Sequence, residues 1–393
     1  MRRFEYYNPQ HLIFGRDSFE QLATLPMPGK KACVVCTEER LFIDRAQALL
    51  KKNGVDSVVY DKVRPNPDTA SINSGAQFAL ENGCDFIVAV GGGSSIDSSK
   101  CIAMLMGNDA KDDIWDYVPY LEGHKKPEKS APYIAVCTTA GPGSGATQSG
   151  VVCNDALNVK LDVCHPCMFA AYTIVDPKLQ VSVPKDLTAM QGMDIIFHCM
   201  EGYLDQFHTP YTDMLYLTAL KYAAGSLRAC FREPDDLEAR GALALADNMS
   251  GMGEAMVDVM SLHAMAHTLG SFHHDIPHGA ALSLLAPEAF AFYCGYPVQT
   301  TQRMAYMSEL LGYGFSAEGC VRFISDILKD LDLYKIDYEQ YGVDPGRAAE
   351  YAHHTVNEIS CYMDKDEHSP TAEEVEAMFN KAFERQKRLR EMK

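Results

Sequence analysis

The sequence predicts an α/β domain followed by an all-helical domain. Over residues 1–183, short apolar runs typical of strands alternate with amphipathic stretches typical of helices. Beyond residue 184, long helical stretches follow one another and strand-like runs are nearly absent. A chain of 393 residues also exceeds the size of one ordinary hydrophobic core. We therefore predict two domains, residues 1–183 and residues 184–393.

The elements of the first domain follow each other as strand, then helix. Apolar runs rich in β-branched residues predict strands at residues 31–37, 56–63, 84–90 and 132–137. The three stretches between these four strands have helical character, at residues 40–54, 71–83 and 91–107. Strands that alternate with helices form a parallel sheet covered on both faces, so we expect that arrangement here.

Composition and charge limit what the protein can do. An apolar content of 47% favours a folded chain, and a formal net charge of −18 disfavours nucleic acid and anionic membranes as partners. No apolar run approaches the roughly 20 residues that span a bilayer, and the N-terminus lacks the apolar segment of a signal peptide. Thirteen scattered cysteines without disulfide spacing indicate free thiols. These observations predict a cytoplasmic protein.

Two glycine-rich turns follow predicted strands. Gly91–Gly93 comes directly after an apolar run, and Asp97 lies in the first turn of the helix that we expect next. Glycines let the backbone approach a phosphate, and a helix start offers free N–H groups to it. A second loop of this kind occupies residues 138–145. Two such loops at the strand ends of one sheet predict a Rossmann-like dinucleotide crevice, although the first turn does not match the G-x-G-x-x-G pattern.

The end of the strand at residues 31–37 bears on the choice of dinucleotide. Glu38 follows this strand directly. A carboxylate at this place accepts a hydrogen bond from the ribose 2′-hydroxyl group and repels a 2′-phosphate, which favours NAD(H) over NADP(H). Arg40 leaves the alternative open, because a guanidinium there can instead reach a 2′-phosphate.

A carboxylate and several imidazoles are spaced for metal binding. Asp194 and His198 are four residues apart on one predicted helical face, and His263 and His267 form a second such pair. His278 follows beyond a turn. One carboxylate with three imidazoles, namely Asp194, His198, His263 and His278, is a donor set suited to Fe(II) or Zn(II), between which the sequence does not decide.

These stretches together resemble the iron-containing (group III) alcohol dehydrogenase family over nearly the whole chain. The resemblance rests on four motifs, GGGSSIDSSK (91–100), TTAGPGSG (138–145), GMDIIFHCMEGY (192–203) and HAMAHTLGSFHHDIPHG (263–279). The resemblance implies a dehydroquinate synthase-like architecture and a homodimer or larger homo-oligomer. It also implies hydride transfer between a small primary alcohol or diol and NAD(P), with a divalent metal as Lewis acid.

The resemblance also implies roles for individual residues. Asp194, His198, His263 and His278 would bind the metal, and His267 would lie beside it and relay a proton. The dinucleotide would be held by Asn66, Gly92, Gly93, Ser94, Asp97, Thr138, Thr139 and Lys160, together with Glu38.

The chain departs from the family pattern at several places. Pro142 and Gly145 replace a Thr and a Glu in the second loop, and residues 254–260 (EAMVDVM) replace small, Gly-rich packing before His263. Large apolar side chains near the ligands, at Phe197, Met256 and Met260, suggest a narrow apolar pocket, although each also suits ordinary core. Three alternatives stay open: a glycerol dehydrogenase-like polyol oxidoreductase, a lyase similar to dehydroquinate synthase, and a nucleotide-binding relative without catalysis.

Overall fold

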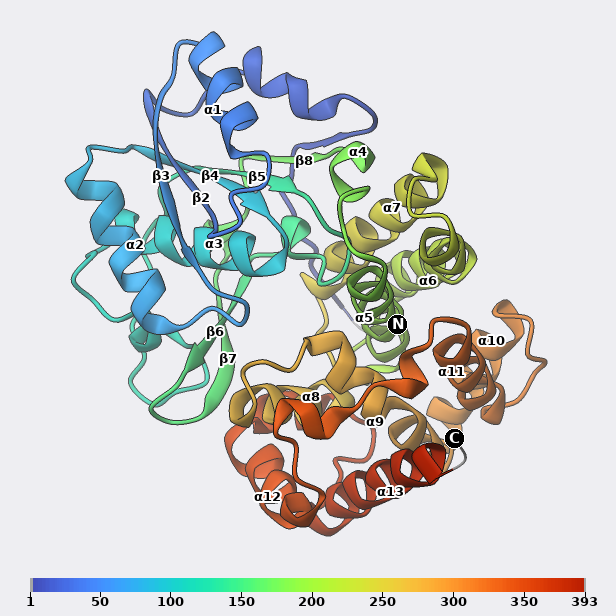
Figure 1. The fold of residues 1–393 in the computed structure, drawn as a ribbon. Coiled ribbons are helices and arrows are strands. Elements are labelled where there is room, and N and C mark those ends of the chain that lie inside the picture. Colours follow the sequence, from blue (N-terminus) through green and yellow to red (C-terminus); the bar gives the residue numbers. More distant parts are fainter. Residues whose placement is uncertain (1–2, 392–393) are drawn as a thin grey trace. The chain divides into compact units, whose positions relative to one another are not determined.

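The computed structural model describes residues 3–391, which form two compact units (Figure 1). The first unit, Tyr6–Val183, contains every strand, and the second contains residues 3–5 and the helices that follow Pro184. A parallel sheet in the first unit and a purely helical second unit confirm the predicted fold class.

The α/β unit is built on a six-stranded sheet in the order β1-β8-β5-β4-β2-β3. Every neighbouring pair is parallel. The central strands are buried along nearly their whole length, as expected for a sheet covered on both faces. The strands are β1 (Leu12–Phe14), β2 (Lys31–Thr37), β3 (Asp56–Val63), β4 (Phe86–Gly91), β5 (Tyr133–Cys137) and β8 (Tyr172–Val175).

The helices of this unit pack on the sheet and bury apolar side chains against it. Its main core joins Leu22, Val34, Ile43, Leu50 and Val88, all without exposed surface. The α-helices are α1 (Ile43–Lys52), α2 (Thr69–Glu81), α3 (Gly93–Gly107) and α4 (Pro177–Gln180). Short 3₁₀ segments lie at Ser18–Ala23, Ile114–Tyr117, Ser144–Ala146 and Pro166–Met168.

A two-stranded antiparallel sheet stands where no element was predicted. It pairs β6 (Ser149–Asn154) with β7 (Val159–Cys164), and both strands lie between β5 and β8 in the sequence. The hairpin turns through Asn158, whose φ is 53°, and packs closely on α3. A Cβ atom at Gly150 would lie 2.9 Å from the Cys101 Sγ and 3.0 Å from the Asp97 carbonyl oxygen. Tertiary packing on α3 therefore supports this hairpin.

The second unit is helical throughout the residues that the structure describes. Its α-helices are α5 (Lys185–Leu204), α6 (Pro210–Arg232), α7 (Leu237–Glu254), α8 (Ser261–Phe272), α9 (His278–Tyr293), α10 (Val298–Leu310), α11 (Glu318–Asp330), α12 (Ala348–Glu358) and α13 (Ala372–Glu391). Its 3₁₀ segments are Leu333–Lys335, Tyr338–Tyr341, Pro345–Arg347 and Ser360–Lys365. Small residues let neighbouring helices approach closely. At Gly202 of α5, for example, the Tyr216 ring of α6 fills the place of a side chain.

Two further features bear on the predictions from composition. All thirteen cysteines are free thiols, as the sequence predicts. Among the described helices, none combines the length and apolarity that a membrane span requires.

Candidate metal centre and nucleotide site

The helical unit brings the predicted metal ligands together around one carboxylate oxygen. Asp194 lies inside α5, His263 in the first turn of α8, and His278 is the first residue of α9. The Asp194 Oδ1 atom lies 3.6 Å from His263 Nε2, 3.7 Å from His278 Nε2 and 3.6 Å from His198 Nδ1. Asp194, His263 and His278 each offer a donor atom within 4.8 Å of the others.

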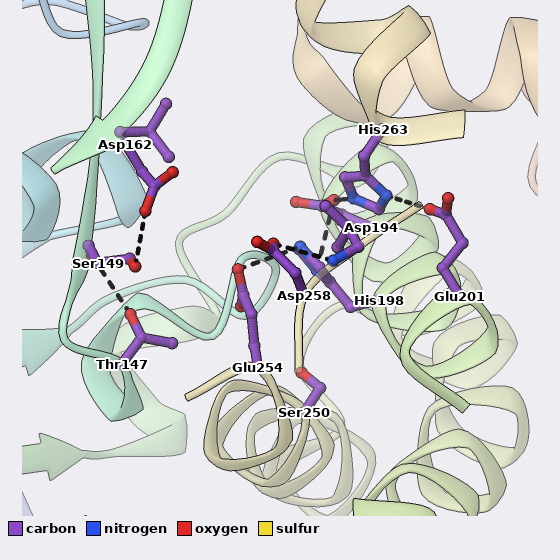
Figure 2. Close-up of polar contacts among 12 residues, drawn as sticks. Thr147, Ser149, Asp162, Asp194, His198, Glu201, Ser250, Glu254, Asp258 and His263 are labelled. Carbon is purple, nitrogen blue, oxygen red and sulfur yellow. Dashed lines mark hydrogen bonds and ion pairs between the residues drawn. The ribbon is translucent and has the colours of Figure 1, made fainter. Parts of the chain in front are cut away.

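His198 is placed differently from the other three residues. Its ring stacks on the His263 ring, with a centroid distance of 4.5 Å, and it is not part of the three-residue group (Figure 2). Its Nδ1 faces Asp194, whereas its Nε2 lies 4.0 Å from the Glu254 Oε1. His198 therefore stands between two carboxylates.

The donor set fits a divalent cation. Ligand atoms about 2.1 Å from a tetrahedral metal ion are about 3.4 Å from one another, close to the separations around Asp194. The Asp194 Oδ1 and His263 Nε2 atoms are buried, and neither has a hydrogen-bond partner among the described residues. Buried polar atoms without partners are rare and cost free energy, and a shared cation would satisfy both atoms.

Glu201 fixes the orientation of the His263 ring. Both side chains are buried, and a Glu201 Oε2 contacts His263 Nδ1 while its Oε1 accepts a hydrogen bond of 3.1 Å from the Met260 N–H. With its proton on Nδ1, His263 presents the Nε2 lone pair towards Asp194. Burial opposes ionisation of this imidazole, but the carboxylates of Glu201 and Asp194 outweigh it and raise the pKa of His263 to about 10. The surroundings of His263 thus attract positive charge.

The first turn of α8 is held by side chains distant in sequence. The N-cap residue, Met260, has no capping side chain, so the first N–H groups need other acceptors. Asp366 accepts hydrogen bonds from the Ser261 N–H at 2.9 Å and the Ser261 Oγ at 2.8 Å, and the Tyr293 hydroxyl accepts one from the Leu262 N–H at 3.1 Å. These contacts position the turn that carries His263.

His267 lies one turn beyond His263 on α8 and is 5% exposed. Its ring centroid is 5.2 Å from that of His278 and 5.2 Å from that of Tyr362. The structure therefore brings His267 beside the candidate ligand group.

In the α/β unit, the two glycine-rich turns lie against each other. The Thr138 N–H donates to the Gly91 carbonyl group, with an N–O distance of 3.0 Å. A Cβ atom at Gly92 would meet the Thr139 Oγ1 at 2.7 Å, and one at Gly93 would meet Pro142 Cγ at 2.6 Å. Gly92 is the N-cap of α3 and leaves the first N–H groups of that helix without a side-chain cap. This arrangement suits a phosphate group.

Asp97 does not cap α3. The helix begins at Gly93, which puts Asp97 beyond the first turn, where it is 6% exposed. The expected first-turn position is therefore wrong. Asp97 Oδ1 lies 3.6 Å from Lys100 Nζ, and Asp97 Oδ2 accepts a hydrogen bond from the Val151 N–H. Burial raises the pKa of Asp97, against the opposing effect of Lys100.

Lys100 is a buried charged residue that was not among the predicted site residues. It has no exposed surface, and its ammonium group donates to Thr147 Oγ1 at 2.8 Å. A lysine three residues after Asp97, in a helix otherwise made of small and apolar residues, was the available signal. Its contacts tie α3 to the segment that leads into β6.

The remaining nucleotide candidates lie at two places in the α/β unit. Lys160 of β7 donates a hydrogen bond of 3.0 Å to the Asn66 side chain, so the fold joins two candidates 94 residues apart in sequence. Glu38 is exposed just after β2. Arg40 forms an exposed ion pair of 3.4 Å with Asp61.

Of the three large apolar residues near the candidate ligands, two take the alternative of ordinary core. Phe197 and Met260 have no exposed surface, and the Phe197 ring packs 6.4 Å from that of Phe290. Both belong to the helical core because they face neighbouring helices. Met256 is partly exposed.

Two family models match consecutive parts of the chain. Residues 9–177 match "Iron-containing alcohol dehydrogenase", and residues 188–383 match "Fe-containing alcohol dehydrogenase family, C-terminal". Among curated proteins, the choline dehydrogenase of Bacillus subtilis is 32% identical over 305 residues, which cover 75% of this chain and 73% of that protein. The NAD-dependent methanol dehydrogenase of Bacillus methanolicus is 29% identical, over 87% of this chain and 88% of its own length.

A solved structure agrees with these matches. The archaeal alcohol dehydrogenase ADH/D1 from a Red Sea brine pool superposes with a TM-score of 0.92 at 28% identity. The likeness covers 97% of this chain and 100% of that chain. The chain therefore belongs to the iron-containing alcohol dehydrogenase family.

Proposed function

We propose that this protein is a metal-dependent, NAD-linked oxidoreductase that interconverts a small primary alcohol or diol and the corresponding aldehyde. The observation that carries the proposal is the position of Asp194 Oδ1, 3.6–3.7 Å from three imidazole nitrogens. Family membership and the NAD-dependent methanol dehydrogenase among the relatives support alcohol chemistry with NAD. The relatives' names extend the range of candidate alcohols from methanol to choline.

The proposed metal ligands are Asp194, His198, His263 and His278. An Fe(II) or Zn(II) ion at this place supplies a positive charge that lowers the pKa of the substrate hydroxyl group, and the nicotinamide ring accepts the hydride. We propose that His267 accepts the hydroxyl proton and passes it to solvent.

The proposed dinucleotide site is formed in residues 1–183 and the metal site in residues 184–393. The turn at Gly92, Gly93 and Ser94 would hold the phosphates, with Thr138 and Thr139 beside it. Asn66 and Lys160 would contact the cofactor as a pair, and Asp97 would order the loop from its buried position. Glu38 would bind the ribose 2′-hydroxyl group.

We further propose that the enzyme works in the cytoplasm as a homodimer or larger homo-oligomer. The absence of disulfides among its thirteen cysteines is typical of a reducing compartment. Sedimentation velocity of the purified protein measures its oligomeric state directly, and a monomer at all concentrations would contradict this part of the proposal.

The test combines metal analysis with an activity panel. Protein purified without oxygen should contain iron or zinc, and it should reduce NAD⁺ with C2–C6 primary alcohols or diols. His263→Ala should lose both metal and turnover but still bind NADH. Full turnover by metal-free His263→Ala would contradict the proposed centre.

The same panel separates the alternatives. A polyol oxidoreductase of the glycerol dehydrogenase kind would prefer glycerol to butanol. A nucleotide-binding relative without catalysis would bind NADH but turn over none of these alcohols.

A further inference from the structure

A third carboxylate lies beside the metal-site histidines. Glu254 is the last residue of α7, and its Oε1 is 4.0 Å from His198 Nε2 (Figure 2). Its side chain is 22% exposed, whereas that of Asp194 is 6% exposed. Glu254 therefore occupies a more open position than the metal-site carboxylate, on the other side of the His198 ring.

The charges around the histidines leave an excess of negative charge. Asp194, Glu201 and Glu254 contribute three carboxylates, and a divalent ion contributes two positive charges. One negative charge remains while the imidazoles are neutral ligands. The C-terminal end of α7 adds a partial negative charge where Glu254 stands.

Asp258 is the other acidic side chain in the EAMVDVM segment. The Asp258 carboxylate accepts a hydrogen bond of 3.0 Å from the Val259 N–H, and it lies close enough to Lys365 to favour that residue's charged form. The Glu254 carboxylate reaches the histidine group. This segment is also where the chain departs from the small, Gly-rich pattern noted above.

We propose that Glu254 is a specificity-determining residue that selects alcohols carrying a cationic ammonium group a short carbon chain away from the hydroxyl. This inference rests on the proposed function, because it names the substrate class of the same site. With the hydroxyl at the Asp194–His263–His278 group, the ammonium group would lie near Glu254. A carboxylate in a partly buried site attracts an ammonium ion more strongly than it does in bulk water.

The reaction itself is unchanged by this choice of substrate. The alcohol carbon loses a hydride to NAD⁺, the hydroxyl loses its proton, and an ammonium aldehyde forms. The ammonium group takes no part in bond making, so Glu254 acts on substrate affinity and orientation.

The experiment compares two alcohols of the same shape and different charge. Choline carries a trimethylammonium group, and 3,3-dimethylbutan-1-ol carries a neutral tert-butyl group in its place. The metal-loaded full chain should oxidise choline with a kcat/KM about ten to a hundred times higher, as expected for one charge-assisted contact. Glu254→Gln should bring this ratio close to one and leave metal content unchanged.

A matched control and a binding measurement complete the test. Glu238→Gln removes one charge from the exposed first turn of the same helix and should leave the ratio unchanged. Calorimetry with tetramethylammonium chloride, which has no hydroxyl group to oxidise, should show binding to the wild-type protein and about tenfold or more weaker binding to Glu254→Gln.

Each adverse outcome has a distinct meaning. A ratio of one or below in the wild type, or an unchanged ratio in Glu254→Gln, would overturn the inference. So would loss of metal from Glu254→Gln, because Glu254 would then belong to the metal site. Oxidation of butanol without any preference for choline would leave the proposed function standing, whereas failure with every alcohol would reject the proposed function itself.

Discussion

Asp366 offers a test of how the first turn of α8 is held. Its carboxyl group is 2% exposed and receives hydrogen bonds from Ser261 and Tyr296. Burial raises the pKa of Asp366 to about 8, which outweighs the opposing effect of these hydrogen bonds. Asp366→Asn replaces it with a neutral group of the same shape. The amide oxygen can still accept from the Ser261 N–H, and the amide N–H groups can face the two hydroxyl oxygens, which rotate to accept.

The sign and size of the effect follow from the pKa. Because the folded-state pKa lies above the ordinary value of 3.8, this group stabilises the fold fully below about pH 4 and loses that contribution as the pH rises to about 8. In between, the free energy of unfolding should fall by about 1.4 kcal/mol for each pH unit, or about 2.7 kcal/mol from about pH 5 to about pH 7. Asp366→Asn should lack this part of the pH dependence.

The assay is urea unfolding of both proteins at several pH values, followed by circular dichroism at 222 nm. This signal reports the helices of both units, most of which lie in the second unit, whereas the single tryptophan, Trp115, reports the α/β unit alone. The difference in the free energy of unfolding between wild type and variant removes the contribution of the other titrating groups, because both proteins share it. Asp330→Asn, which removes a carboxylate paired with Arg228 at the surface, should parallel the wild type. Parallel curves for Asp366→Asn and wild type would refute a carboxyl group that is protonated in the folded protein near neutral pH.

Three further predictions concern the metal and nucleotide sites. Glu201→Gln should weaken metal binding about ten- to a hundredfold in a chelator competition, since an amide no longer holds His263 in its ligating tautomer; unchanged affinity would refute the role of Glu201. Glu38→Gly should raise the ratio of kcat/KM with NADPH to kcat/KM with NADH about tenfold, because it removes a carboxylate whose repulsion of the 2′-phosphate is worth about 1.4 kcal/mol. An unchanged ratio would contradict the proposed contact of Glu38 with the ribose. Gly92→Ala should raise the dissociation constant of NADH without loss of metal, because its Cβ atom would lie 2.7 Å from Thr139 Oγ1; equal affinity would show that the turn is not the phosphate site.

The elements that the sequence predicted well are those with a strong local pattern. The strand predicted at residues 31–37 is β2 with the same bounds, and the strand predicted at 56–63 is β3. The helix predicted at 40–54 is shorter in the structure, because Phe42 adopts a left-handed conformation and α1 begins at Ile43. The β6–β7 hairpin escaped prediction, since its stability depends on contacts with α3. Such contacts between distant residues leave no regular spacing of apolar residues in the sequence.

Helical spacing in the sequence indicates two pairs of residues in the candidate metal site. Asp194 and His198 share a face of α5, and His263 and His267 share a face of α8. Sequence spacing could not show that His198 would face a second carboxylate, because Glu254 comes from α7 and approaches the ring only through tertiary packing. Nor could apolarity distinguish pocket from core, so for Phe197 both alternatives stayed open until the structure placed it in the core.

The start of α8, which carries His263, is capped by side chains that are distant in the sequence. A helix normally begins with Ser, Thr, Asp or Asn, whose side chain accepts a hydrogen bond from the first free N–H groups. At the start of α8 that position holds Met260, which has no such acceptor. The acceptors come instead from Glu201, 59 residues earlier, and Asp366, 105 residues later. A buried helix start with no local cap thus predicts that distant polar side chains converge on it, although the sequence does not say which. In this protein one of those side chains, Glu201, also orients His263, so the cap of the helix and the tautomer of the proposed ligand depend on the same carboxylate.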